Sequence, residues 1–172
     1  MGYTLVIGNA CFDGDKADAY LSVWATPEAH DAAPTFPNDE MTGNGNMRSP
    51  SYSVWADFCR SVGLYGMFYG VNGRRNPYME GDPHCHRETP ILADHPGYAL
   101  ITKEDALAIH QALERHIAKH GNLDAGPRGW TEKEGEAPAD AEACAERARL
   151  LWLDYWVSWA VENCEWPVIV NS

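Results

Sequence analysis

Residues 150–170 read LLWLDYWVSWAVENCEWPVIV, and they dictate most of the architecture. The first part of this stretch is apolar nearly all round a helix, which is typical of a helix in the centre of a core or in an oligomer interface. Pro167 ends that helix, and Val168-Ile169-Val170 then predicts a short buried strand. We therefore expect a long alanine-rich helix over residues 139–164, followed by a strand.

The N-terminal end of the chain supplies a partner for that strand. Residues 3–10 contain a short apolar run, which predicts a buried strand. Residues 20–25 are rich in β-branched and aromatic side chains, so we expect them to form a hairpin with the first strand. Further short strands are expected at residues 64–71 and 98–101.

Two more helices are recognised by their ends. Ser49 as the cap with Pro50 just inside is the favoured start of one helix, with Ser51 or Ser53 as alternative caps, and Gly63 closes it. Thr102 and Asp105 have the spacing of a capping box at the start of another helix, which Gly121 ends.

The capping-box helix also sets an expectation for its faces. The expected inner face contains Leu107, His110, Leu113 and Ile117, which are spaced three, three and four residues apart. His116 and His120 lie four residues apart on the same helix, and we expect them to point to solvent. The predicted fold class is α+β, with a small sheet from the chain ends packed on three helices and two long loops at residues 26–46 and 72–97.

Composition defines the class of protein. The 172 residues correspond to a single domain over residues 1–172, with 45% hydrophobic and 22% charged residues, as in ordinary folded proteins. The net charge of −12 argues against binding to nucleic acid or to an anionic membrane, since both need a basic face. We find no signal peptide and no membrane span. The five cysteines form no C-x-x-C pair, which favours reduced thiols in a cytoplasm.

Arginines suggest an anion site at the start of the first predicted helix. Residues 41–90 contain five basic residues, all of them arginine, inside an otherwise acidic chain. Arginine binds phosphate or carboxylate through its planar fork, and helix N-termini attract anions. The predicted ligand-binding residues are Asn46, Arg48, Ser49, Ser51, Tyr52, Arg74, Arg75 and Arg87. The alternative is that the serines only cap the helix and the arginines pair with surface acids.

Other chemistries have weaker support in the sequence. His84, His86 and His95 could form a zinc site, but hydrogen-bonded loop histidines are the simpler interpretation, so we predict no metal and no cofactor. Cys59 and Cys85 lie in no nucleophile motif, and no phosphate-binding loop is present, which favours a protein without enzymatic activity. Residues 13–40 contain seven acids and one lysine, and such a surface could imitate nucleic acid.

A resemblance adds a biological context. Residues 46–59, with Gly63-Leu64 and His95-Pro96-Gly97, resemble small uncharacterised proteins encoded by bacteriophages. The resemblance implies an accessory protein of the bacterial host cytoplasm and assigns no functional residue. The expected function is counter-defence: a homo-oligomer sequesters a phosphate-bearing small molecule such as a nucleotide signal. The alternatives are an acidic inhibitor of a host protein and a metal-dependent hydrolase.

Overall fold

The sheet joins the two ends of the chain, as predicted. The computed structural model describes residues 1–12, 21–36, 45–70, 91–92, 97–121, 123 and 139–171, and the account below concerns these residues. They form an α+β fold in which one antiparallel sheet packs against helices. The strands are β1 (Leu5–Phe12), β2 (Leu21–Trp24), β3 (Met47–Arg48), β4 (Gly97–Leu100) and β5 (Pro167–Asn171).

Strand β5 lies inside the sheet because both of its edges are paired. The order is β2-β1-β5-β4, and β3 pairs with the free part of β1. Ile7 of β1 faces Ile169 of β5, and Ala99 of β4 faces Ile169 from the other side. The expected hairpin of β1 and β2 is confirmed, with Ala10 opposite Val23. The fold therefore closes only when the last residues of the chain reach the first ones.

The three predicted helices are present, but α2 begins two residues later than the favoured start, because the alternative cap Ser51 takes the place of Ser49 and Pro50 lies before the helix. Ser51 caps α2, which ends at Gly63 with a φ of 79°, a backbone conformation that favours glycine. Thr102 and Asp105 form both hydrogen bonds of the capping box on α4. The helices are α1 (Pro27–Ala32), α2 (Tyr52–Val62), α3 (Tyr65–Tyr69), α4 (Lys103–His120) and α5 (Ala141–Asn163).

Two short helices and a short strand correct the sequence predictions. Residues 26–46 were expected to be a loop, but Thr26 accepts a hydrogen bond from the Ala29 amide and starts α1. Just after residue 46, β3 pairs with β1. Residues 64–71 were expected to be a strand, and α3 forms there instead. Packing decides this case, because a helical turn buries Phe68 against Trp55.

The buried face of α4 also differs from the expected one. Leu107 and His110 are exposed, whereas Ile109, Ala112 and His116 are buried. Leu113 is buried as predicted, but the packing of α4 against α5 turns the buried face away from Leu107 and His110.

Helix α5 is the centre of the core. Trp152 and Trp156 are fully buried, and the Trp152 indole donates a hydrogen bond to the Gly45 carbonyl at 2.7 Å. The helix packs on α4 along its length and contacts β1 and β5 of the sheet. Among the described residues, none of the helices combines the length and the apolar run that a membrane crossing requires.

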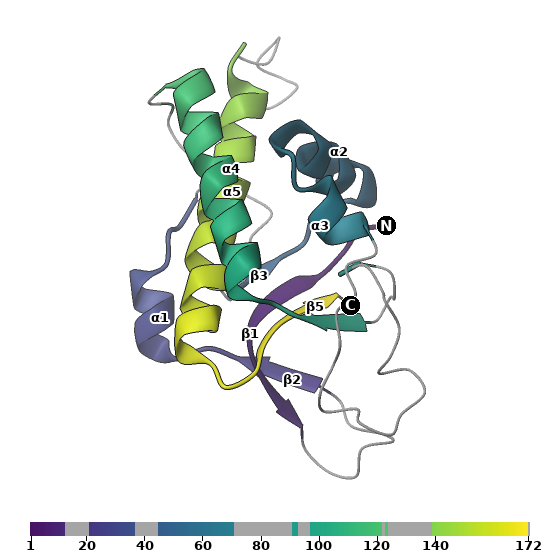
Figure 1. Ribbon diagram of the computed structural model, residues 1–172, viewed down its shortest axis with the longest axis vertical. Coiled ribbons are helices and arrows are strands. Elements are labelled where there is room, and N and C mark those ends of the chain that lie inside the picture. Colours follow the sequence, from purple (N-terminus) through teal and green to yellow (C-terminus); the bar gives the residue numbers. More distant parts are fainter. Residues whose placement is uncertain are drawn as a thin grey trace.

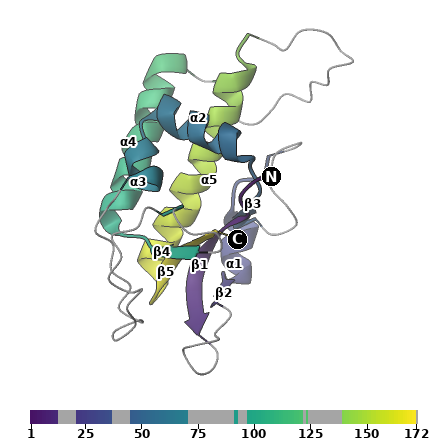
Figure 2. The ribbon, with the colours of Figure 1, turned by 90° about the vertical axis from the view of Figure 1, so that its right-hand side faces the viewer.

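The helices extend beyond the sheet at one end. Figures 1 and 2 show α4 and α5 side by side, with the end of α4 and the start of α5 projecting away from the strands. Helix α2 lies next to this projecting end, where it contacts α4. Three helices therefore meet at a place that the sheet does not cover.

Candidate metal centre

Of the predicted anion-binding residues that the structure describes, some lie in the interior and others on the surface. Arg48 is fully buried, and its guanidinium carbon lies 5.3 Å from the centre of the Trp152 ring. Asn46 is also buried, and its side-chain amide donates to the Ile7 carbonyl at 2.8 Å. The two residues therefore contact the sheet and α5, and their side chains face inward.

The hydroxyl groups of that prediction lie on the outside. Ser49 and Ser51 are exposed, and the Ser51 hydroxyl accepts a hydrogen bond from the Val54 amide as the cap of α2. Tyr52 packs edge-on against Tyr3 with ring centres 4.5 Å apart. The structure thus separates Arg48 from the serines. The remaining candidates lie outside the described residues: Arg74, Arg75 and Arg87 for the anion, and His84, His86 and His95 for a metal.

A different cluster forms where the three helices meet. His116 and His120 of α4 and Glu146 of α5 each direct one donor atom toward the others, and these atoms all lie within 4.8 Å of one another. The Nε2 atom of His116 is 3.3 Å from Oε2 of Glu146. The rings of His116 and His120 have centres 4.6 Å apart. This is a compact set of two imidazoles and one carboxylate.

His116 is buried without a well-aligned hydrogen bond, which corrects the expectation that it points to solvent. Its side chain is 4% exposed and that of Glu146 is 8% exposed. Neither ring nitrogen of His116 has a well-aligned hydrogen-bond partner. Burial, reinforced by His120, lowers the pKa of His116, although Glu146 acts in the opposite direction. Glu146 contacts only Nε2 of His116 and without good hydrogen-bond alignment, so an additional ligand between the two groups would be stabilising here.

Local sequence explains how the cluster is held. Residues four apart on a helix project from the same face, which brings His116 and His120 together. Arg147 of α5 donates a hydrogen bond to the Gly121 carbonyl at 2.7 Å and so ties α5 to the end of α4. The last turn of α4 carries the negative end of the helix dipole, which favours a cation.

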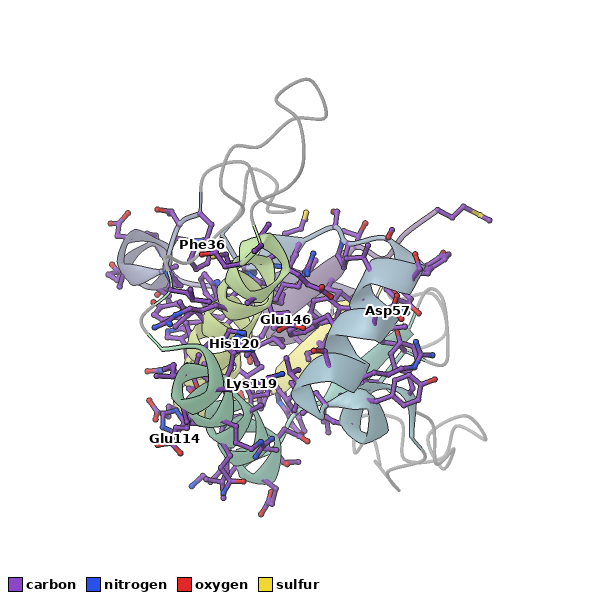
Figure 3. All side chains as sticks on the ribbon, turned by 90° about the horizontal axis from the view of Figure 1, so that it is seen from above. Phe36, Asp57, Glu114, Lys119, His120 and Glu146 are labelled. Carbon is purple, nitrogen blue, oxygen red and sulfur yellow. The ribbon has the colours of Figure 1, made fainter. Side chains whose placement is uncertain are left out.

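A pocket opens next to the cluster. Its volume is about 190 Å³, and all three helices contribute to its wall. The lining residues are Ser61 and Val62 of α2, Ala112, Arg115, His116, Lys119 and His120 of α4, and Glu146 of α5. Figure 3 shows Glu146, His120 and Lys119 gathered between these helices, while Glu114 and Asp57 lie on outer faces.

The donor set fits a divalent transition metal such as zinc. Zinc is held by imidazole nitrogens and carboxylate oxygens at about 2.0–2.2 Å, which in a tetrahedron places donors about 3.3 Å apart. The distance from His116 to Glu146 already matches. The donor atom of His120 lies within 4.8 Å of the other two, and a small rotation of this half-buried side chain would bring it to the tetrahedral separation. Three protein ligands leave a fourth position for water or substrate, as in catalytic zinc sites.

The sequence contained part of this signal. The i, i+4 spacing of His116 and His120 was visible, but it is common on exposed helix faces. Glu146 is one of 25 acids, and no local pattern links it to α4. No family model, curated protein or solved structure matches this chain.

Proposed function

We propose that this protein is a metal-dependent hydrolase whose zinc ion is held by His116, His120 and Glu146. The observation that carries the proposal is the buried imidazole of His116. Its ring nitrogens lack a well-aligned hydrogen bond, and its Nε2 is in ion-pair contact, at 3.3 Å, with a carboxylate oxygen of Glu146 that is also buried. A cation between these atoms would satisfy both groups at once.

The chain's own residues support the chemistry of such an ion. The lowered pKa of His116 keeps its imidazole neutral, which is the form that binds metal. Glu146 supplies one negative charge, and the pocket leaves space on the side of the fourth position. Bound zinc lowers the pKa of a coordinated water to about 7, which supplies a nucleophile for ester hydrolysis. In that reaction the water oxygen bonds to the ester centre, and the alcohol oxygen leaves with the bonding electrons and takes a proton.

The first test is zinc binding. Protein stripped with a chelator and dialysed is titrated with zinc chloride by calorimetry, and we expect one ion per chain. Loss of a group that only supports a ligand weakens metal binding by about 10–100-fold. Loss of a direct ligand, in H120A or E146Q, should therefore weaken it by about a hundredfold or more. Thermal denaturation should show a higher midpoint with zinc than without it.

A matched control lies on the same helix. His110 is exposed, and its Nδ1 is 3.1 Å from Asp154 on a part of α4 outside the cluster. H110A should bind zinc as the unmodified protein does. Zinc binding that is equal in H110A, H120A and E146Q would contradict the site and leave the cluster as a structural contact.

Turnover is the second test. Zinc-loaded protein is given p-nitrophenyl acetate or p-nitrophenyl phosphate, and we expect hydrolysis that H120A loses. Zinc binding without hydrolysis would contradict the enzymatic part of the proposal. It would favour the earlier hypothesis, a counter-defence protein that sequesters a phosphate-bearing small molecule, with the ligand on the metal. That hypothesis, the acidic inhibitor of a host protein and the homo-oligomer all remain predictions.

A further inference from the structure

We infer that the open side of this metal site receives the phosphate group of a small molecule, with Arg115, Lys119 and Ser61 as its protein contacts. This inference rests on the proposed metal site and adds the class of ligand. Its basis is the wall of the pocket, because the residues around the cluster are those that bind oxyanions.

Arg115 comes from α4 and reaches toward α2. One of its terminal nitrogens would be 3.7 Å from a Cβ atom placed on Gly63, the residue that ends α2. The guanidinium therefore reaches the C-terminal end of α2, beside the pocket that Arg115 lines. A guanidinium presents several N–H donors in a fixed plane, and this geometry matches two oxygens of a phosphate group.

Lys119 adds a second cation on the same face of α4 as Arg115, and Ser61 adds a hydroxyl from α2. Lys119 lies on α4 one residue before His120, and Figure 3 shows the two side by side. Ser61 stands on α2, on the facing wall. A phosphate monoester has three free oxygens, so it can engage the metal, the guanidinium, the ammonium and the hydroxyl together. A carboxylate has only two oxygens and would leave some of these donors unused.

The charge and the volume of the pocket both favour a phosphate group as the ligand. The chain as a whole carries −12, so an anion approaches only where positive charge is concentrated. A bound divalent ion with Arg115 and Lys119 would outweigh the single charge of Glu146 in the pocket. Drug-sized ligands need pockets of about 300–1,000 Å³, and this pocket holds about 190 Å³. It therefore suits a phosphate group, with the rest of the molecule outside.

The test uses cobalt as a paramagnetic probe. Protein loaded with one Co²⁺ ion is titrated with inorganic phosphate and with phenyl phosphate, and the ³¹P line width is recorded. We expect broadening by the cobalt-loaded protein and none by metal-free or zinc-loaded protein. Calorimetry of the zinc-loaded protein should show phosphate binding and much weaker binding of acetate. Acetate that binds as tightly as phosphate would overturn the choice of ligand.

Variants separate this inference from the metal site itself. R115Q and K119Q should keep their metal content, measured by mass spectrometry, and each should weaken phosphate binding about tenfold. The matched controls R60Q and K103Q change exposed cations outside the pocket, and they should leave the phosphate affinity unchanged. Full metal loading without ³¹P broadening would overturn the inference while the metal site stands. Absence of metal loading would overturn both. Phosphate affinity that is equal with and without metal, or insensitive to R115Q, would also overturn the inference.

Discussion

At the scale of single residues, Arg48 belongs to the core of the protein. Its side chain is fully buried, and its guanidinium stacks on Trp152 of α5 while its backbone belongs to β3. A buried arginine is stabilising only when its neighbours compensate its charge, and removal of one member of such a set costs about 3–5 kcal/mol. The residue therefore connects the short strand to the central helix.

We predict that R48A lowers the free energy of unfolding by about 3 kcal/mol or more. The change removes a buried charge from its partners and leaves space against Trp152. Urea denaturation followed by circular dichroism measures this loss. The control R60A removes an exposed arginine that pairs with Asp57, and it should cost no more than about 1 kcal/mol. Unchanged stability in R48A would instead agree with a ligand-binding role for this residue.

At the scale of the elements, the two ends of helix α4 differ in what their side chains contact. Thr102 and Asp105 hold its start through reciprocal hydrogen bonds of 2.8 Å and 3.3 Å between backbone amides and side chains. His116 and His120 lie in its last two turns, next to Glu146. The start of the helix is therefore held by its cap, whereas its end carries two of the three proposed zinc ligands.

We predict that T102A destabilises the protein by about 1 kcal/mol and leaves zinc affinity unchanged. His116 is 14 residues further along, about 21 Å at 1.5 Å per residue, so the lost cap does not reach the site. Urea denaturation and zinc calorimetry on the same samples measure the two quantities. T102S keeps the hydroxyl and should retain most of the stability. A loss of zinc affinity in T102A comparable to that in H120A would show that the two ends are coupled.

At the scale of the whole molecule, several weak acids of the described residues are buried or half-buried. Burial raises the pKa of the Cys59 thiol on α2, of the Tyr69 hydroxyl on α3 and of the Tyr155 hydroxyl on α5. It also raises the pKa of Cys164, after α5, to about 11. These groups stay neutral in the folded protein at a pH where the unfolded chain already ionises. Their contribution to stability is complete below the unfolded pKa values and is lost as pH rises toward the folded ones.

We therefore predict an alkaline loss of stability. The free energy of unfolding should fall as pH rises above about 8.5, where an unfolded thiol begins to ionise. Urea denaturation between about pH 7 and pH 10 measures the slope. C59A is less stable at every pH, but its slope should be shallower because one ionising group is gone. A slope equal to that of the unmodified protein would exclude Cys59 as a contributor.

Local patterns were sufficient for most of the elements. The cap at Thr102, the alternative cap at Ser51 and the terminal Gly63 and Gly121 fall where the sequence places them, because each acts on backbone groups within a few residues. The strands at both chain ends were recognisable from apolar runs. Helix α3 was not, because the burial of Phe68 against Trp55 outweighs the strand preference of its aromatic residues.

The amino-acid sequence by itself therefore determined the α+β class, the sheet built from both chain ends and the limits of the long helices. Only the tertiary structure decided that Arg48 faces inward and that His116 is buried opposite Glu146. The physical reason is the distance along the chain between the residues that interact. Helix caps and periodicity depend on neighbours along the chain. The proposed metal site depends on the packing of α4 against α5, because Glu146 lies 26 residues after His120 in the sequence.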